Sequence, residues 1–260
     1  MKALSIAVLW LICAGAVMAE GLTPEQVAKN KARRAASLAA KGGLVTKPQK
    51  GNYARIVSVQ KTVDLSYIQQ VAKDVNTGLG IPVEVTAMVA GESPFADVKK
   101  VLQMPKTGVA LLIVEDASLP TILSAPENAW AILNVKSIGD DMPPKDVYDL
   151  RVRKEINRAF ASAFGAGNSF HKPCVMEPVY SKADLDGLKM KIVSPEALSK
   201  ILDACKYRGI EPIRIATYKR AVSEGWAPAP TNDVQRAIWK EVHALPTNPI
   251  KIKYDPKLDK

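Results

Sequence analysis

The residues best placed to do chemistry lie in segment 151–176, which predicts a long helix, a glycine turn and a short loop. An apolar stripe marks the buried side of the helix expected over 147–164: Ile156, Phe160, Ala163 and Phe164. Positions 158 and 162 are four apart, so their side chains project from one adjacent face. Histidines at both positions, a glutamate beside the first and a third ligand after a glycine turn would hold a catalytic zinc ion.

The side chains at these positions do not supply that chemistry. The positions carry Arg158, Ala159, Ser162 and, after the turn at Gly165, Asn168. A guanidinium stays protonated and cannot bind a cation, alanine cannot accept a proton, and serine and asparagine are poor zinc ligands. The sequence therefore predicts no metal-activated water at this helix, no catalytic residue and no cofactor.

Gly165, Cys174 and Met176 nevertheless have a spacing that resembles the archaemetzincins, a family of zinc metallopeptidases with the pattern HExxHxxGxxH, then Cys, four residues and Cys-x-Met. The three positions match without a gap, and the preceding segment 151–155 also resembles the family's approach to its helix. The resemblance covers about 54–201 and implies a metzincin-like domain. It also implies a second, structural zinc site, whose cysteine positions here hold Ser169, Cys174, Ser194 and Ala197. Both zinc sites are degenerate, so the resemblance implies a pseudopeptidase.

Arg158 has two interpretations. In one it fills the vacated zinc position, and its guanidinium donates to Ser162, Asn168 or a neighbouring carboxylate. It could then still bind a ligand carboxylate or carbonyl. In the other it extends into solvent. A non-standard zinc site around His171 and Cys174 is a further alternative, without recognisable spacing.

The first nineteen residues predict a secretory signal peptide. Lys2 precedes an apolar run over 4–18, and Val17 and Ala19 are the small residues expected before cleavage after position 19. No later stretch reaches the ~18 apolar residues of a membrane span. We therefore expect an exported, periplasmic or extracellular protein, in which Cys174 and Cys205 are the remaining cysteines. An oxidising compartment permits a disulfide between them, and the sequence leaves this open.

The pattern along the chain predicts an α/β (α+β) fold, with a mixed twisted sheet, a long active-site-type helix and a small, mostly helical C-terminal extension. Segment 20–52 is expected to be a basic helical arm and linker, 53–205 the metzincin-like domain, and 206–260 the extension. Strands are expected over 54–59, 82–89, 109–114 and 130–135, the last near the sheet edge, with a further edge strand over 250–254. A helix is expected after its cap at Asn232.

The formal net charge of +10 becomes +9 once Lys2 is removed (10 − 1). In an exported protein this charge favours acidic partners or anionic envelope polymers over nucleic acid. Three hypotheses follow. The chain binds a peptide or protein partner without cutting it, through strand addition. Alternatively, it is a structural module that binds an anionic envelope polymer through its basic arm, or it is a zinc peptidase with non-standard ligands.

Overall fold

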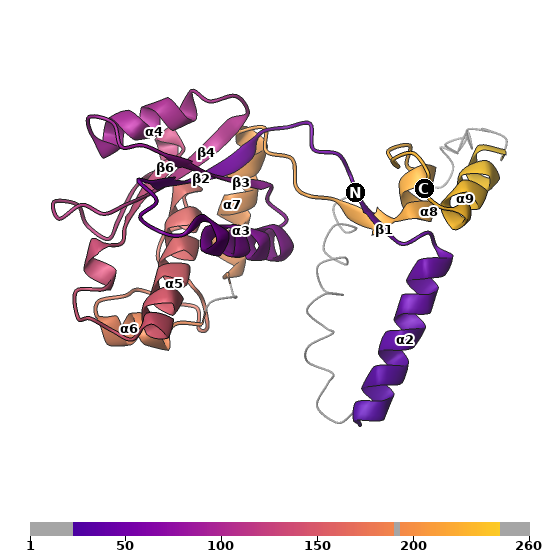
Figure 1. Ribbon diagram of the computed structural model, residues 1–260, viewed down its shortest axis with the longest axis horizontal. Coiled ribbons are helices and arrows are strands. Elements are labelled where there is room, and N and C mark those ends of the chain that lie inside the picture. The colour runs from indigo at the N-terminus through magenta and orange to yellow at the C-terminus, as the bar shows by residue number, and fades with distance from the viewer. Residues whose placement is uncertain (1–22, 190–192, 245–260) are drawn as a thin grey trace, which may run out of the picture. The chain divides into compact units, whose positions relative to one another are not determined.

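The computed structural model describes residues 23–189 and 193–244, which divide into two compact units (Figure 1). The larger unit is Pro48–Arg214. The smaller unit combines the residues before Pro48 with those from Ile215 onward. The arm and the extension, which the sequence presented as separate segments, therefore belong to one unit. Their link is a two-stranded antiparallel ladder between β1 (Leu44–Thr46) and β7 (Ile215–Thr217).

The larger unit is built on a five-stranded mixed sheet of order β3-β2-β4-β6-β5. The strands are β2 (Tyr53–Val59), β3 (Val83–Met88), β4 (Thr107–Val114), β5 (Ile122–Ala125) and β6 (Trp130–Asn134). All neighbours are parallel except β5 and β6, which run antiparallel. The predicted mixed α/β sheet is confirmed.

Both faces of this sheet are covered, so its central strands alternate between two cores rather than between core and solvent. In β4, Leu111 packs into the core that includes helix α5 (Lys145–Ala163), and Leu112 packs into the opposite core with helix α4 (Pro94–Leu102). Helices α3 (Leu65–Leu79) and α7 (Pro195–Tyr207) lie on the α5 side (Figure 1).

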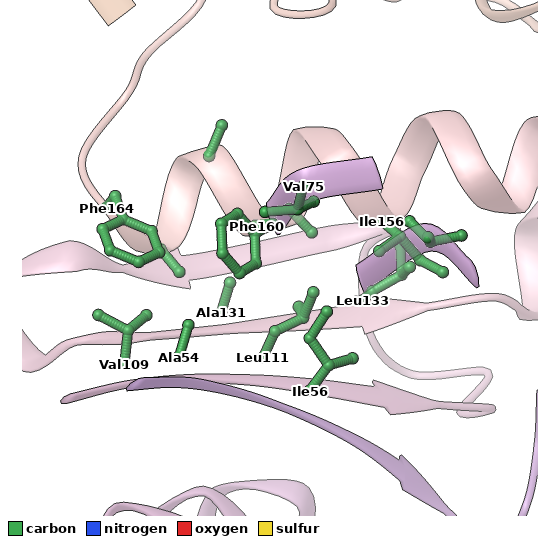
Figure 2. Close-up of a cluster of buried hydrophobic side chains, with 14 of the residues drawn as sticks. Ala54, Ile56, Val75, Val109, Leu111, Ala131, Leu133, Ile156, Phe160 and Phe164 are labelled. Atoms are coloured by element: carbon green, nitrogen blue, oxygen red, sulfur yellow. The ribbon is translucent and has the colours of Figure 1, made fainter. Parts of the chain in front are cut away.

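Helix α5 is fixed on the sheet by the apolar stripe that the sequence predicts. Ile156, Phe160 and Phe164 point toward the strands, and the two phenylalanine rings lie 5.0 Å apart (Figure 2). The helix ends just before Gly165, whose φ of 87° is a left-handed conformation that glycine adopts at no steric cost. The residues on the neighbouring face of α5 are thereby held in fixed directions.

The sheet edge beside α5 is formed by β5, which the sequence analysis did not identify. Segment 130–135 was expected near that edge, and β6 is the strand next to β5, with a neighbour on each side. The Thr121 carbonyl accepts a hydrogen bond from the Asn134 amide at 2.8 Å. Since antiparallel strands alternate inward and outward backbone groups, the N–H and C=O groups of Ile122 and Ser124 point away from β6. No strand within the described residues pairs with this edge.

The smaller unit contains helix α2 (Pro24–Ala40), α8 (Tyr218–Ser223) and α9 (Asp233–Ala244) beside its two strands. Its core consists of Tyr218, Val222 and Ile238. Gly42 has a φ of 78°, and a Cβ there would lie 2.8 Å from the Tyr218 Cβ, so this close approach requires glycine. The predicted signal peptide and the strand expected over 250–254 lie outside the described residues.

None of the helices within 23–189 and 193–244 combines the length and apolarity that a bilayer crossing requires.

Candidate functional site

A cleft of about 470 Å³ opens beside the start of β5. Its walls are contributed by the 3₁₀ turn Lys136–Ile138, by α5, and by the segment that leads into helix α6 (Lys182–Gly187). The lining includes Thr121, Ile122, Asp140, Glu155, Arg158 and Lys182. The exposed strand edge and the polar face of α5 therefore meet in one cavity.

Arg158 and Glu155 form a buried ion pair on the cleft side of α5. The Arg158 Nη1 donates to the Glu155 Oε1 at 2.8 Å, and the side chains are 11% and 3% exposed, respectively. The interpretation in which Arg158 pairs with a neighbouring carboxylate is confirmed, and the one in which it extends into solvent is wrong. Among the described residues, neither Ser162 nor Asn168, the other expected partners, is hydrogen-bonded to it.

This ion pair is incompletely satisfied. The Glu155 Oε2 and the Arg158 Nε are both buried without a hydrogen-bond partner within the described part of the chain. Burial raises the pKa of Glu155, and the neighbouring Arg158 charge opposes that rise. Few buried polar atoms in folded proteins lack partners, and those that do call for an explanation.

The other positions that the resemblance assigns to a catalytic zinc site do not converge on the cleft. Ala159 is fully buried in the core, Ser162 is half-buried, and Asn168 is exposed beyond the turn. A catalytic zinc ion, which the resemblance implies, would instead face the Arg158 cation at the first ligand position. These residues do not fit zinc. Elsewhere in 23–189 and 193–244, no group of three or more His, Cys, Asp or Glu side chains could hold a metal ion.

The positions that the resemblance assigns to a second, structural zinc site do come together, as a hydrogen-bonded junction. The Cys174 Sγ accepts hydrogen bonds from the amides of Ser194 (3.3 Å) and Met176 (3.4 Å). The Ser194 hydroxyl caps α7 by accepting from the Ala197 amide, and the Ser169 amide donates to the Met176 carbonyl. The retained Cys174 and Met176 therefore hold the loop after α5 against α7.

The possible disulfide between Cys174 and Cys205 is not formed, since both residues are buried free thiols. Each contributes to the core against α5, where a small apolar side chain fits without being cross-linked. His171 is exposed whereas Cys174 is buried, so the two do not present ligands to a common space.

A second set of charges holds the α6 wall of the cleft in place. Arg151 donates to both oxygens of Asp186 (2.7 and 2.8 Å) and of Asp141 (2.7 and 2.9 Å). The buried Lys154 donates to the carbonyls of Leu185 (2.8 Å) and Asp186 (2.6 Å). Sequence reasoning missed these roles, because charged residues on a helix ordinarily indicate a solvated face.

No protein-family model matches this chain, and no curated protein matches its sequence. Among solved structures it is similar to archaemetzincin from Methanopyrus kandleri, with 18% identity and a TM-score of 0.48 over 60% of this chain and 98% of that one. It is also similar to a zinc-dependent peptidase from Methanocorpusculum labreanum, with 14% identity and a TM-score of 0.45 over 57% and 100% of the two chains. The first belongs to the family that the spacing of Gly165, Cys174 and Met176 resembles, and the likeness is one of fold.

Proposed function

We propose that this chain is an exported, non-catalytic protein that binds an extended peptide segment of a partner along the outer edge of β5. One observation carries the proposal: an open strand edge borders a cleft that holds an arginine–glutamate pair instead of catalytic groups. Export is inferred from segment 1–19.

The edge of β5 has the groups that strand addition requires. Ile122 and Ser124 direct their N–H and C=O groups away from β6, and Ile122 also lines the cleft. An incoming extended chain would take its main-chain hydrogen bonds from these groups and place alternate side chains into the cleft. The α6 wall, held by Arg151 and Lys154, gives this groove a fixed width.

The cleft lacks a group that would activate water. Two carboxylates of the described residues line the cleft. The Oε1 of Glu155 is bonded to Arg158 and its Oε2 is buried away from solvent, and Asp140 is paired with Lys182. A general base must reach the proton that it removes. Ala159, at the position of the family's glutamate, cannot accept a proton. We therefore expect binding without hydrolysis.

Removing the outward amide of Ser124 tests strand addition. Ser124→Pro deletes an N–H that does not bond to β6, so the sheet should remain intact while binding of a randomised decapeptide mixture is lost. Ala87→Pro is the matched control, because β3 forms the opposite edge of the sheet and is not part of the cleft lining. Equal binding by Ser124→Pro and Ala87→Pro would show that β5 is not the binding edge.

The non-catalytic part of the proposal is tested by metal analysis of the mature protein after exposure to zinc and dialysis against a mild chelator. We expect less than about a tenth of an equivalent of zinc, because folded zinc sites retain the ion tightly. About one equivalent, with peptide hydrolysis that a strong chelator abolishes, would establish the zinc peptidase alternative.

Helix α2 supports a second candidate function, binding of an anionic envelope polymer. The helix has no buried residue, and it carries Lys29, Lys31, Arg33 and Arg34. Replacing these four by glutamine preserves good helix formers and should abolish any salt-sensitive binding to an anionic polysaccharide. Unchanged binding by this variant would exclude α2 as the polymer site.

A further inference from the structure

We infer that Arg158 is the receptor for a carboxylate in this cleft, and that the peptides bound there present either a free C-terminus or an acidic side chain to it. The inference rests on the proposed function, because the peptide must lie along β5. It adds the chemical class of the ligand.

The first argument is the unused hydrogen-bonding capacity of Arg158. Its guanidinium has five N–H donors, yet within 23–189 and 193–244 its one recorded hydrogen bond goes to Glu155. Its Nε is buried without a partner and out of reach of solvent, so a ligand would bind the terminal N–H groups of a side chain that is 11% exposed and lines the cleft. A guanidinium edge matches a carboxylate through two parallel N–H···O bonds. A ligand carboxylate would supply the acceptors that the protein does not.

The second argument is the charge balance of the lining. Asp140, the other acidic residue there, is already paired with Lys182. The remaining charges in the lining are Glu155 and Arg158, which face each other. Only Glu155 opposes an incoming carboxylate, and it can lose its charge because burial favours its protonated form.

Binding is therefore coupled to the protonation of Glu155. When the ligand carboxylate pairs with Arg158, the guanidinium lowers the pKa of Glu155 less strongly, so protonation of Glu155 becomes more favourable. The ligand carboxylate stays ionised, and no covalent bond changes. Because protons are bound together with the ligand, affinity for the carboxylate peptide should rise as the pH falls.

The third argument is position. Ile122 and Arg158 line the same cavity, one from the strand edge and the other from α5. A peptide hydrogen-bonded to Ile122 thus passes within the cavity that contains the guanidinium. Tyr180, which is 87% exposed and also lines the cavity, offers an aromatic surface beside it.

Three peptide mixtures test the inference, each a randomised octapeptide with the same acetylated, labelled N-terminus. One ends in a free carboxylate, one in an amide, and one in an amide after a fixed aspartate. We expect the free acid, the aspartate peptide or both to be retained at least about tenfold more strongly than the plain amide. Which of the two is retained identifies the source of the carboxylate.

Variants distinguish a receptor from a structural residue. Arg158→Met should reduce the preference for carboxylate to about one, and Arg158→Lys should restore part of it. Glu155→Gln should bind the acidic mixture more tightly at pH 8 and lose the pH dependence. Should Arg158→Met fail to fold, Glu155→Gln/Arg158→Met removes both charges together and is tested in its place.

The outcomes separate the two proposals. Equal retention of all three mixtures, abolished by Ser124→Pro, would overturn the inference and leave strand addition intact. A carboxylate preference that survives the loss of Arg158 would also overturn it. Retention of none of the mixtures would overturn the proposed function, and with it the inference.

Discussion

Two arginines lie seven residues apart on α5, and their surroundings differ. Arg151 is bound by both oxygens of Asp141 and of Asp186, and it also donates to the Ile138 carbonyl at 3.3 Å. Among the described residues, Arg158 has one hydrogen bond, to a glutamate that is itself incompletely satisfied. Both side chains are at least largely buried, with 5% and 11% exposed.

The difference separates a cation that maintains the structure from one with capacity for a ligand. The partners of Arg151 are carboxylates that are about two-fifths exposed, so water helps to solvate them. The partner of Arg158 is almost fully buried and depends on the arginine for charge compensation. The pKa directions agree with this: hydrogen bonding to Arg151 lowers the pKa of Asp186 and of Asp141, whereas burial raises the pKa of Glu155.

The largest expected effect follows from removing Arg158. Arg158→Met leaves Glu155 as an uncompensated buried charge, which should lower the free energy of unfolding by about 3 kcal/mol at pH 7. Glu155→Gln/Arg158→Met removes both charges and should recover most of that loss. Chemical denaturation of the two variants and the wild type measures both values. An unchanged stability of Arg158→Met would show that the pair is not buried in solution.

Removing Arg151 should have a smaller effect on stability. Arg151→Met breaks the charged hydrogen bonds to Asp141 and Asp186, and their exposed carboxylates then turn to water, so we expect a loss of about 2 kcal/mol. Arg151→Lys, which keeps the charge but cannot bind two carboxylates bidentately, should fall between. Faster amide exchange over 182–187 would accompany the loss. If Arg151→Met lowered the free energy of unfolding more than Arg158→Met does, the expected order of the two arginines would be wrong.

The two sites should respond oppositely to pH. The pKa of Glu155 is raised above its ordinary value of 4.5, so the stability that its protonation contributes is present below that value and is lost as the pH rises through the raised pKa. The pKa of Asp186 is lowered from 3.8, so its contribution is present above 3.8 and is lost as the pH falls through the lowered pKa.

The variants Glu155→Gln and Asp186→Asn isolate these contributions when unfolding is measured from pH 2 to pH 8. The difference between wild type and Glu155→Gln should change by at most about 1.4 kcal/mol per pH unit, the limit for one proton. If the two differences vary in the same direction, the assignment of Glu155 to a desolvated site is wrong.

The smallest effect concerns the thiols. Burial raises the pKa of Cys205 to about 11, and both Cys174 and Cys205 are buried. In the chain from residue 20 onward, thiol reagents should therefore react with neither cysteine within minutes in the native state. Two thiols per chain should react in denaturant without a reductant. A count of zero in denaturant would reveal a disulfide, contrary to the free thiols described above.

The sequence predicted the central sheet strands and the buried face of α5, because long apolar patterns determine which side faces a core. It did not predict β1 or β5, with three and four residues, respectively. Such strands are too short to show alternation, and their pairing depends on partners elsewhere in the chain. Helix α4 was also missed, although Ser93 followed by Pro94 is a recognisable helix start.

For the site, the sequence indicated which catalytic residue types are missing from α5, but it did not indicate which residues line the cleft. That Arg158, Ala159, Ser162 and Asn168 are unsuited to zinc chemistry was readable from their side chains alone. The role of Glu155 was not, because a glutamate within Arg-Lys-Glu is ordinarily solvated and nothing local indicates that it is 2% exposed. Burial of a charge depends on the tertiary fold.

The ladder between β1 and β7 has a consequence for how the chain is made. Its innermost partners, Thr46 and Ile215, are 169 positions apart (215 − 46), so the first half of the smaller unit is synthesised long before the second. The larger unit is contiguous in sequence, so all of it is synthesised before β7, whereas the smaller unit can form only after the residues from Ile215 onward have been made. Along the chain, residues 48–214 lie between the two strands of this ladder. Excising residues 48–214 and joining β1 to β7 by a short turn would leave the smaller unit as one continuous segment.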